Sequence, residues 1–220
     1  MRLDQAFFRR DALDVARDVV GALLLRGPVT LRITEVEAYR ANGDTANHCR
    51  FGLTARNAAM FGPPGHAYIY LCYGMHWMLN LVTDEAGVGA AVLVRSAEVV
   101  EGHDIVLARR FASREAPTLS AMTRRQQDEL LAGPGKVGQA LDLGTAMNHH
   151  PLYRRGGLEI HASPAPLPPL AVGPRVGIDY ADPEHRDAPW RVADANSPSV
   201  SARKTLSPPT RLKPLARGAG

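Results

Sequence analysis

Hydrophobic and polar residues alternate with a period of two between Val29 and Tyr39, the pattern of a strand with one buried face. The residues of one face begin apolar and end with two carboxylates and a phenol ring: Val29, Leu31, Ile33, Glu35, Glu37 and Tyr39. A half-buried carboxylate beside an aromatic ring is unfavourable unless it is paired, which makes this strand end a candidate site. The run also fits a strand that emerges into water with both carboxylates solvated, and taken alone it favours that simpler interpretation.

Further periodic segments before and after this strand predict a mixture of helices and strands. Helices are expected over residues 11–21, 98–110, 123–131 and 133–141, with a short capped turn at 54–57. Strands are expected over residues 23–25, 90–94 and 158–162, with a hairpin that joins residues 68–71 to 77–82. The pattern predicts a single mixed α+β domain.

Two segments of the C-terminal third have a distinctive composition. Residues 162–174 are rich in proline and predict a rigid surface connection. Residues 201–220 are basic and rich in Pro and Ser, and they predict a disordered tail. The expected organisation is therefore a domain over residues 1–200, followed by a tail over 201–220.

Composition indicates a soluble intracellular protein of one domain. The 220 residues suffice for a real core, and neither a membrane-spanning apolar stretch nor a signal-peptide pattern is present. Two cysteines, Cys49 and Cys72, do not suggest a disulfide framework, and no Cys/His cluster has the spacing of a zinc site, so no metal is expected. Without the five basic residues of the tail, the 26 Lys and Arg fall to 21 against 22 acidic residues. Any basic surface for nucleic acid must therefore be local.

Three other features carry candidate chemistry, each with a plainer alternative. His48 lies in a loop, where a lone histidine is usually a solvent-exposed side chain without a catalytic role. Tyr68 and Tyr70 share one strand face and fit a packed core, which we expect for Tyr68, whereas Tyr73 falls at the hairpin turn, out of easy reach of a core. The turn Gly133-Pro-Gly-Lys136 before a helix offers free N–H groups to a phosphate, although such turns often only connect elements.

Taken together, the motifs resemble one family. Glu35-x-Glu37-Ala-Tyr39, His48 nine residues later, and Tyr68-x-Tyr70-x-x-Tyr73-Gly-Met75 followed by Asn80 are similar to the alkyladenine (3-methyladenine) DNA glycosylases. The resemblance runs from Phe7 to about Ser199. It implies a curved, mainly antiparallel sheet flanked by helices, with a protruding β-hairpin that inserts into DNA.

The resemblance also implies a catalytic group of Glu37, Arg95 and His48. Glu37 would activate a water molecule at C1′ of the target nucleotide, and Arg95 would lie beside that water. Glu35 is the rival carboxylate, and the family pattern assigns the base to Glu37. The three lysines, at positions 136, 204 and 213, lie outside the motif block, which favours direct hydrolysis without a Schiff base.

Binding roles follow from the same resemblance. The expected substrate-binding residues are Tyr39, His48, Tyr70 and Asn80. The expected DNA-binding residues are Tyr73, which would fill the gap left by a flipped base, together with Met75, Gly135, Lys136 and Arg175.

The function implied is cofactor-free release of alkylated or deaminated purines from double-stranded DNA, as the first step of base excision repair. The candidate bases are 3-methyladenine, 7-methylguanine, hypoxanthine and ethenoadenine, which the sequence does not rank. A monomer is expected, away from membranes, in the cytoplasm at the nucleoid if the protein is bacterial and in the nucleus if it is eukaryotic. The alternatives are a non-catalytic binder of damaged nucleic acid and a purine nucleosidase acting on free nucleosides.

Overall fold

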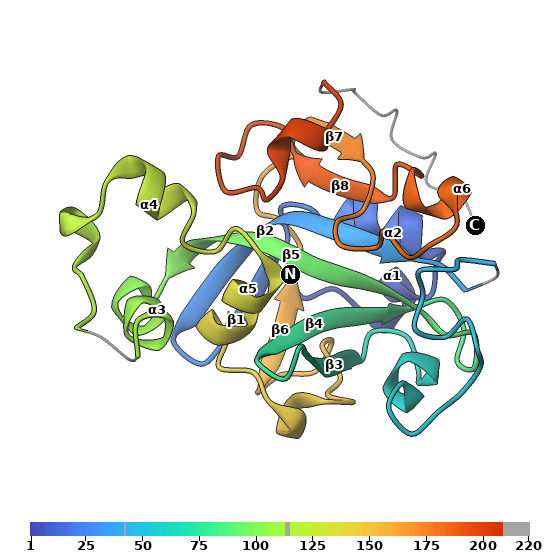
Figure 1. The fold of residues 1–220 in the computed structure, drawn as a ribbon. Helices are drawn as coiled ribbons and strands as arrows, with labels where there is room; N and C mark the ends of the chain where they lie inside the picture. The colour runs from blue at the N-terminus through green and yellow to red at the C-terminus, as the bar shows by residue number, and fades with distance from the viewer. Residues whose placement is uncertain (42, 113–114, 209–220) are drawn as a thin grey trace.

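An eight-stranded sheet forms the centre of the molecule, with short helices around it (Figure 1). The computed structural model describes residues 1–41, 43–112 and 115–208. The strands are β1 (Leu23–Arg26), β2 (Val29–Tyr39), β3 (Ala67–Cys72), β4 (His76–Thr83), β5 (Ala90–Glu101), β6 (Leu158–His161), β7 (Leu170–Gly173) and β8 (Arg191–Asp194). The α-helices are α1 (Gln5–Phe8), α2 (Ala12–Val19), α3 (His103–Arg110), α4 (Arg124–Asp128), α5 (Pro134–Ala140) and α6 (Pro183–Arg186). Short 3₁₀ helices are η1 (Ala58–Phe61), η2 (Leu119–Ala121), η3 (Thr145–Met147) and η4 (Arg203–Thr205).

The strand pairings are antiparallel, in the order β3-β4-β5-β2-β1-β6, with β8 also pairing β2 and β7 pairing β8. The predicted α+β class and mainly antiparallel sheet are thus confirmed, while the curvature and the DNA-inserting role of the hairpin stay predictions. Along one side of β2, β1 pairs with its first residues and β8 with Glu35 to Glu37. Because β5 pairs on the other side, the carboxylate end of β2 lies inside the sheet. None of the described helices is long and apolar enough to cross a membrane.

The main core covers one face of the sheet. Leu79 and Leu81 of β4 and Val92 and Val94 of β5 belong to a single buried cluster with residues of α2, α3 and α5. With a period of two, the residues between them must face the other way. That opposite face carries a smaller apolar cluster, which includes Tyr68, and this placement agrees with the core position expected for that ring.

The alternation of β2 changes phase in the middle of the strand. Leu31 and Ile33 lie in the main core, but beyond them the core residues are Val36 and Ala38. The pairing with β5 shifts register on both sides of Glu35, as a β-bulge requires. The expectation that Ile33 and both carboxylates share a face is therefore wrong: one extra residue in the ladder moves Glu35, Glu37 and Tyr39 to the face opposite the main core.

Two element boundaries differ from the prediction. The helix expected from residue 98 begins at His103, because β5 continues to Glu101 and pairs it with Thr30. The polar side chains that suggested an amphipathic helix instead form cross-strand contacts, such as the ion pair between Arg32 and Glu98 at 2.5 Å. The proline-rich stretch is also not wholly a connection, since its end forms β7 and pairs with β8.

Other local predictions are confirmed. The Asp11 side chain accepts a hydrogen bond from Leu13 N–H and caps α2. The chain turns between β1 and β2 at Gly27, and β3 and β4 pair as a hairpin with Tyr68 opposite Asn80. The polar helix expected over 123–131 exists as the shorter α4, with Thr123 in a capping box.

The tail prediction is wrong for residues 201–208. The Ser201 backbone N–H donates to Glu35 at 2.7 Å. The Ser207 N–H donates to the Val172 carbonyl, and the Ser207 hydroxyl accepts from the Val172 N–H. Arg191 donates to the carbonyls of Ser201 and Ala202. This segment therefore packs onto the domain, whereas the rest of the expected tail, 209–220, lies outside the described residues.

One buried ion pair ties the loop after β2 to the segment after β7. Arg175 donates to both oxygens of Asp44, at 2.6 and 2.7 Å, and both side chains are fully buried. Arg175 also donates to the Ala38 carbonyl. A bidentate pair of this kind holds two loops in one relative position.

We predict that Asp44→Asn destabilises the fold, because it leaves the Arg175 guanidinium buried without its counter-charge. Breaking a buried pair from one side costs about 3–5 kcal/mol. Urea unfolding followed by circular dichroism measures this loss as a lower midpoint at unchanged slope. Asp182→Asn, at an exposed position on the same segment, is the control and should change stability by less than about 0.5 kcal/mol. An unchanged midpoint in Asp44→Asn would contradict the role given to the pair.

Candidate active site

A cavity of about 400 Å³ opens on the face of the sheet opposite the main core. Seven of the residues expected at the site line it: Glu37, Tyr39, His48, Tyr70, Tyr73, Asn80 and Arg95. They come from β2, β3, β4, β5, the β3–β4 turn and the loop after β2. The volume falls in the range of pockets that enclose a small planar ligand.

Glu37 is the carboxylate that this cavity reaches. It accepts hydrogen bonds from Val176 N–H at 2.7 Å and from the Tyr39 hydroxyl at 2.9 Å, and Arg95 Nη1 lies 3.2 Å from it. Burial raises the pKa of Glu37 above its ordinary value, and these three donors oppose that rise. Burial and the neighbouring Glu37 charge raise the pKa of Tyr39, so the phenol keeps the proton that it donates. The result is a fixed carboxylate that is more basic than a solvated one.

Glu35 is fully buried like Glu37 but does not line the cavity. Its two oxygens accept from Ser96 Oγ at 2.6 Å, from Arg191 at 2.8 Å, and from both the N–H and Oγ of Ser201. Four donors occupy the lone pairs that a base would need. The geometry therefore separates two carboxylates that lie only two residues apart.

Arg95 joins the two carboxylates. Its Nε lies 3.4 Å from Glu35, and its Nη1 lies 3.2 Å from Glu37. The side chain reaches the cavity because Arg95 alternates with the core residues Val92 and Val94 and so shares a face of β5 with Leu93, which also lines the cavity.

Aromatic rings form the walls. His48 and Tyr70 pack edge to face with centroids 4.7 Å apart, and His48 Nδ1 hydrogen-bonds the Tyr68 hydroxyl at 3.1 Å. The Arg175 guanidinium lies 4.6 Å from the centroid of the Tyr39 ring. Burial, followed by the charges of two nearby arginines, lowers the pKa of His48, so the imidazole is uncharged at neutral pH.

The tip of the β3–β4 hairpin is strained and exposed. Tyr73 and Gly74 both have positive φ, 51° and 69°, and Met75 N–H donates to the Cys72 carbonyl, as in a type I′ turn. A tyrosine in this backbone region is unfavourable by about 1–3 kcal/mol. The Tyr73 ring is nevertheless 84% exposed and Met75 is 68% exposed. An aromatic ring held out beside a cavity at this cost is a candidate contact for a ligand.

Three of the expected DNA-binding residues have other contacts. A Cβ on Gly135 would lie 2.8 Å from the His76 ring, so this glycine allows α5 to pack closely on β4. The Lys136 ammonium donates to the Glu129 carbonyl at 2.7 Å. Arg175 is buried, so its side chain does not reach DNA from this position and instead supports Tyr39.

Several lining residues were not predicted from the sequence, among them Arg56, Val176 and Tyr180. Arg56 is exposed and close enough to His48 to lower its pKa, and a basic residue just after the His48 motif was the available signal. Tyr180 lies five residues after Arg175, which the resemblance had assigned to DNA binding. The contribution of Val176 is a backbone N–H, which no side-chain pattern can reveal.

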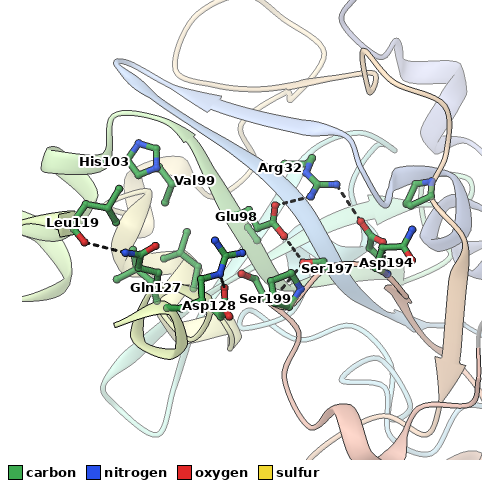
Figure 2. A pocket seen from close by; sticks show the side chains of 17 residues that line it. Arg32, Glu98, Val99, His103, Leu119, Gln127, Asp128, Asp194, Ser197 and Ser199 are labelled. Atoms are coloured by element: carbon green, nitrogen blue, oxygen red, sulfur yellow. Dashed lines mark hydrogen bonds and ion pairs between the residues drawn. The ribbon is translucent and has the colours of Figure 1, made fainter. Parts of the chain in front are cut away.

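A second cavity of about 490 Å³ lies elsewhere on β2 and β5 (Figure 2). Its charges are paired with one another: Arg32 bridges Glu98 at 2.5 Å and Asp194 at 3.1 Å, and Ser197 donates to Glu98. It offers no accessible carboxylate–arginine pair beside aromatic rings. Nor do the described residues contain a group of three or more His, Cys, Asp or Glu side chains that could hold a metal ion.

Comparison with known proteins places the chain in the DNA glycosylase class of hydrolases. The chain belongs to the methylpurine-DNA glycosylase family, whose profile matches residues 6–198. It is 53% identical over 206 residues to a candidate 3-methyladenine DNA glycosylase of Nitrosococcus oceani, covering 94% of this chain and 96% of that protein. It is also 53% identical over 209 residues to a DNA-3-methyladenine glycosylase of Arabidopsis thaliana, covering 95% and 76%. A candidate 3-methyladenine DNA glycosylase of the archaeon Methanocella arvoryzae is 42% identical over 205 residues, covering 91% and 96%.

We predict that Glu37→Gln retains DNA binding but slows base release by about 10²- to 10⁴-fold, the usual contribution of a general base. Single-turnover rates on a duplex with one lesion, together with binding by fluorescence anisotropy, measure both quantities. In the wild-type protein the rate should fall as pH drops through the pKa of Glu37, at a pH above the ordinary glutamate range because burial raises that pKa. Glu184→Gln, at an exposed position, is the control. A normal rate in Glu37→Gln would remove the base from this residue.

Proposed function

We propose that the protein hydrolyses the N-glycosidic bond of alkylated or deaminated purines that are flipped out of duplex DNA, and so begins base excision repair. The observation that carries this proposal is the buried Glu37–Arg95 pair at the end of an aromatic-walled cavity, beside the exposed Tyr73. The names of the relatives point to 3-methyladenine, and 7-methylguanine, hypoxanthine and ethenoadenine complete the candidates. The protein would act as a monomer, at the nucleoid of a bacterium or in a eukaryotic nucleus.

In the proposed reaction Glu37 takes a proton from water as the oxygen bonds to C1′. The glycosidic bond breaks through an oxocarbenium-like transition state, and the base leaves with the bonding electrons. The negative charge of Glu37 stabilises the cationic sugar, and Arg95 keeps that carboxylate ionised. A cationic 3-methyladenine leaves neutral, whereas hypoxanthine must gain a proton as it departs. These steps use only water and groups of this chain.

Selectivity for alkylated purines would come from the aromatic rings that line the cavity. Tyr39, Tyr70 and His48 offer electron-rich ring faces, which attract a positively charged alkylated purine. An imidazolium in the wall would repel such a base. The lowered pKa of His48 removes that repulsion at neutral pH.

Tyr73 would fill the gap that a flipped base leaves in the stack, with Met75 beside it. Side chains that wedge between base steps are bulky and largely apolar, which both residues satisfy. The turn that contains Lys136 would approach the DNA backbone, with its ammonium exchanging the Glu129 carbonyl for a phosphate. A nucleosidase acting on free nucleosides would need none of these contacts.

The decisive experiment measures base release from duplexes that carry each candidate lesion at one defined position, with undamaged duplex and free nucleosides as controls. We expect release from damaged duplexes only. Tyr73→Ala should destabilise the flipped state of ethenoadenine by about 1–3 kcal/mol, the scale of base–aromatic stacking. The fluorescence of ethenoadenine reports the resulting loss of flipped base. Leu167→Ala, exposed and outside the cavity, is the control. Release from free nucleosides at equal rates, insensitive to Tyr73, would favour the nucleosidase.

Asn80 lines the cavity and also bonds to the backbone. Its side-chain amide donates to the Tyr68 carbonyl at 3.1 Å across the β3–β4 pairing, and the residue is 4% exposed. Such a bond holds the amide in one orientation. Guanine makes every contact that hypoxanthine makes and adds an N2 amino group, so its rejection requires a clash or an unpaired donor. We propose that the fixed amide supplies this rejection.

We predict that Asn80→Ser admits guanine and lowers the hypoxanthine-to-guanine ratio of single-turnover rates by at least about tenfold, or ~1.4 kcal/mol. Asn148→Ser is a matched control, because Asn148 also bonds the hairpin backbone, at Ile69 N–H, but lies outside the cavity. An unaltered ratio in a folded, active Asn80→Ser protein would leave Asn80 only its backbone role.

A further inference from the structure

Four charged side chains are buried together behind the cavity: Glu35, Glu37, Arg95 and Arg191. A buried charge destabilises a protein unless a counter-charge and hydrogen bonds satisfy it. The strands supply the charges, but they do not supply every hydrogen bond. The remaining partners come from Pro174 and Val176 and from the segment that follows Val200.

Ser201 is the residue of this segment that reaches furthest into the cluster. Its N–H and Oγ donate to the two oxygens of Glu35, at 2.7 and 2.9 Å. Its Oγ accepts from Arg95 Nε at 3.2 Å and Nη2 at 3.1 Å, and its carbonyl accepts from Arg191 at 3.0 Å. One serine thus contacts three of the four charged side chains.

The contact with Arg95 determines how that guanidinium is turned. A guanidinium is planar and donates along fixed directions. Ser201 Oγ occupies the edge formed by Nε and Nη2, which leaves Nη1 to face Glu37 at 3.2 Å. Glu35 approaches Arg95 only at 3.4 Å, so it holds the same edge less closely.

Hydrogen bonds at several points hold the segment from Ser201 to Ser207 against the sheet. Arg191 donates to the Ala202 carbonyl and to Thr205 Oγ1, and the Ser207 hydroxyl accepts from Val172 N–H of β7. Displacing Ser201 would therefore break contacts at several points.

We propose that Ser201 is a positioning residue for catalysis, which orients Arg95 toward Glu37 from outside the cavity. The inference rests on the proposed function, in which Glu37 activates water. Ser201 does not line the cavity, and substrate binding should not depend on it.

A test by pH is available because Arg95 of β5 is a cation in direct contact with Glu37. Tyr39 and Glu35 of β2 and Tyr70 of β3 are the other titratable groups that act on its pKa. Two further cations, Arg191 and Arg175, contact Glu35 and the Tyr39 ring. If Arg95 turns away, the ionised form of Glu37 loses stabilisation, its pKa rises further, and the acid limb of the rate profile moves to higher pH.

The experiment compares single-turnover release of ethenoadenine from a duplex across pH in full-length proteins. Ser201→Ala should be at least about tenfold slower at neutral pH, since small misplacements at a reacting centre have effects of this size. Its acid limb should lie at higher pH, and its dissociation constant for the duplex should stay within about twofold. Ser201→Thr restores a hydroxyl and should recover most of the rate. Ser120→Ala removes an exposed hydroxyl that bonds Thr118, away from the cluster and its segment, and should match the wild type.

Equal rates and equal pH profiles for Ser201→Ala and wild type would overturn the inference, as would a loss confined to DNA affinity. If Ser201→Ala does not fold, Ser201→Cys carries the same test, because a thiol fills the space but is a weak hydrogen-bonding group. A wild-type protein that releases no base would refute the proposed function itself. An active wild type with an unaffected Ser201→Ala would refute only the role of Ser201.

Discussion

The need to pair buried charge organises the functional half of this protein. Glu35, Glu37, Arg95 and Arg191 lie where β2, β5 and β8 meet, and none has free access to bulk water. An unpaired ion at that depth would cost several kcal/mol, a large part of the stability of a domain. Each partner is therefore held by the others, and these contacts fix Glu37 and Arg95 in the cavity wall.

The pairing of buried charges also gives Glu35 and Glu37 different environments. Glu35 and Glu37 have the same side chain and nearly the same burial, but four donors surround Glu35, whereas the bonds to Glu37 leave it at the cavity wall. One carboxylate is structural and the other is available for chemistry because their surroundings differ. A second buried pair, Arg175 with Asp44, works in parallel, since its guanidinium backs the Tyr39 ring and joins the two loops of the cavity wall.

Local irregularities of the backbone place these groups. The shift of register around Glu35 moves the carboxylates out of the core face. At the hairpin tip, positive φ at Tyr73 projects an aromatic ring into solvent. Both features occur at the site, where a regular sheet would have pointed the carboxylates into the apolar core and a relaxed turn would have carried a glycine or asparagine.

Local signals in the sequence determined α2 with its Asp11 cap, the β1–β2 and β3–β4 hairpins, and a motif set whose residues meet in one cavity, because capping, alternation and turn chemistry act over a few residues. Tertiary structure decided the rest. The bulge at Glu35 depends on pairing with a strand some 60 positions away, so a period of two assigned Glu35 and Glu37 to the wrong face. The sequence assigned Arg175 to a DNA contact, whereas in the folded protein Arg175 is buried against Asp44. The composition of residues 201–208 predicts disorder, yet buried charges far away in sequence hold Ser201 in place, and no local pattern encodes a contact of that range.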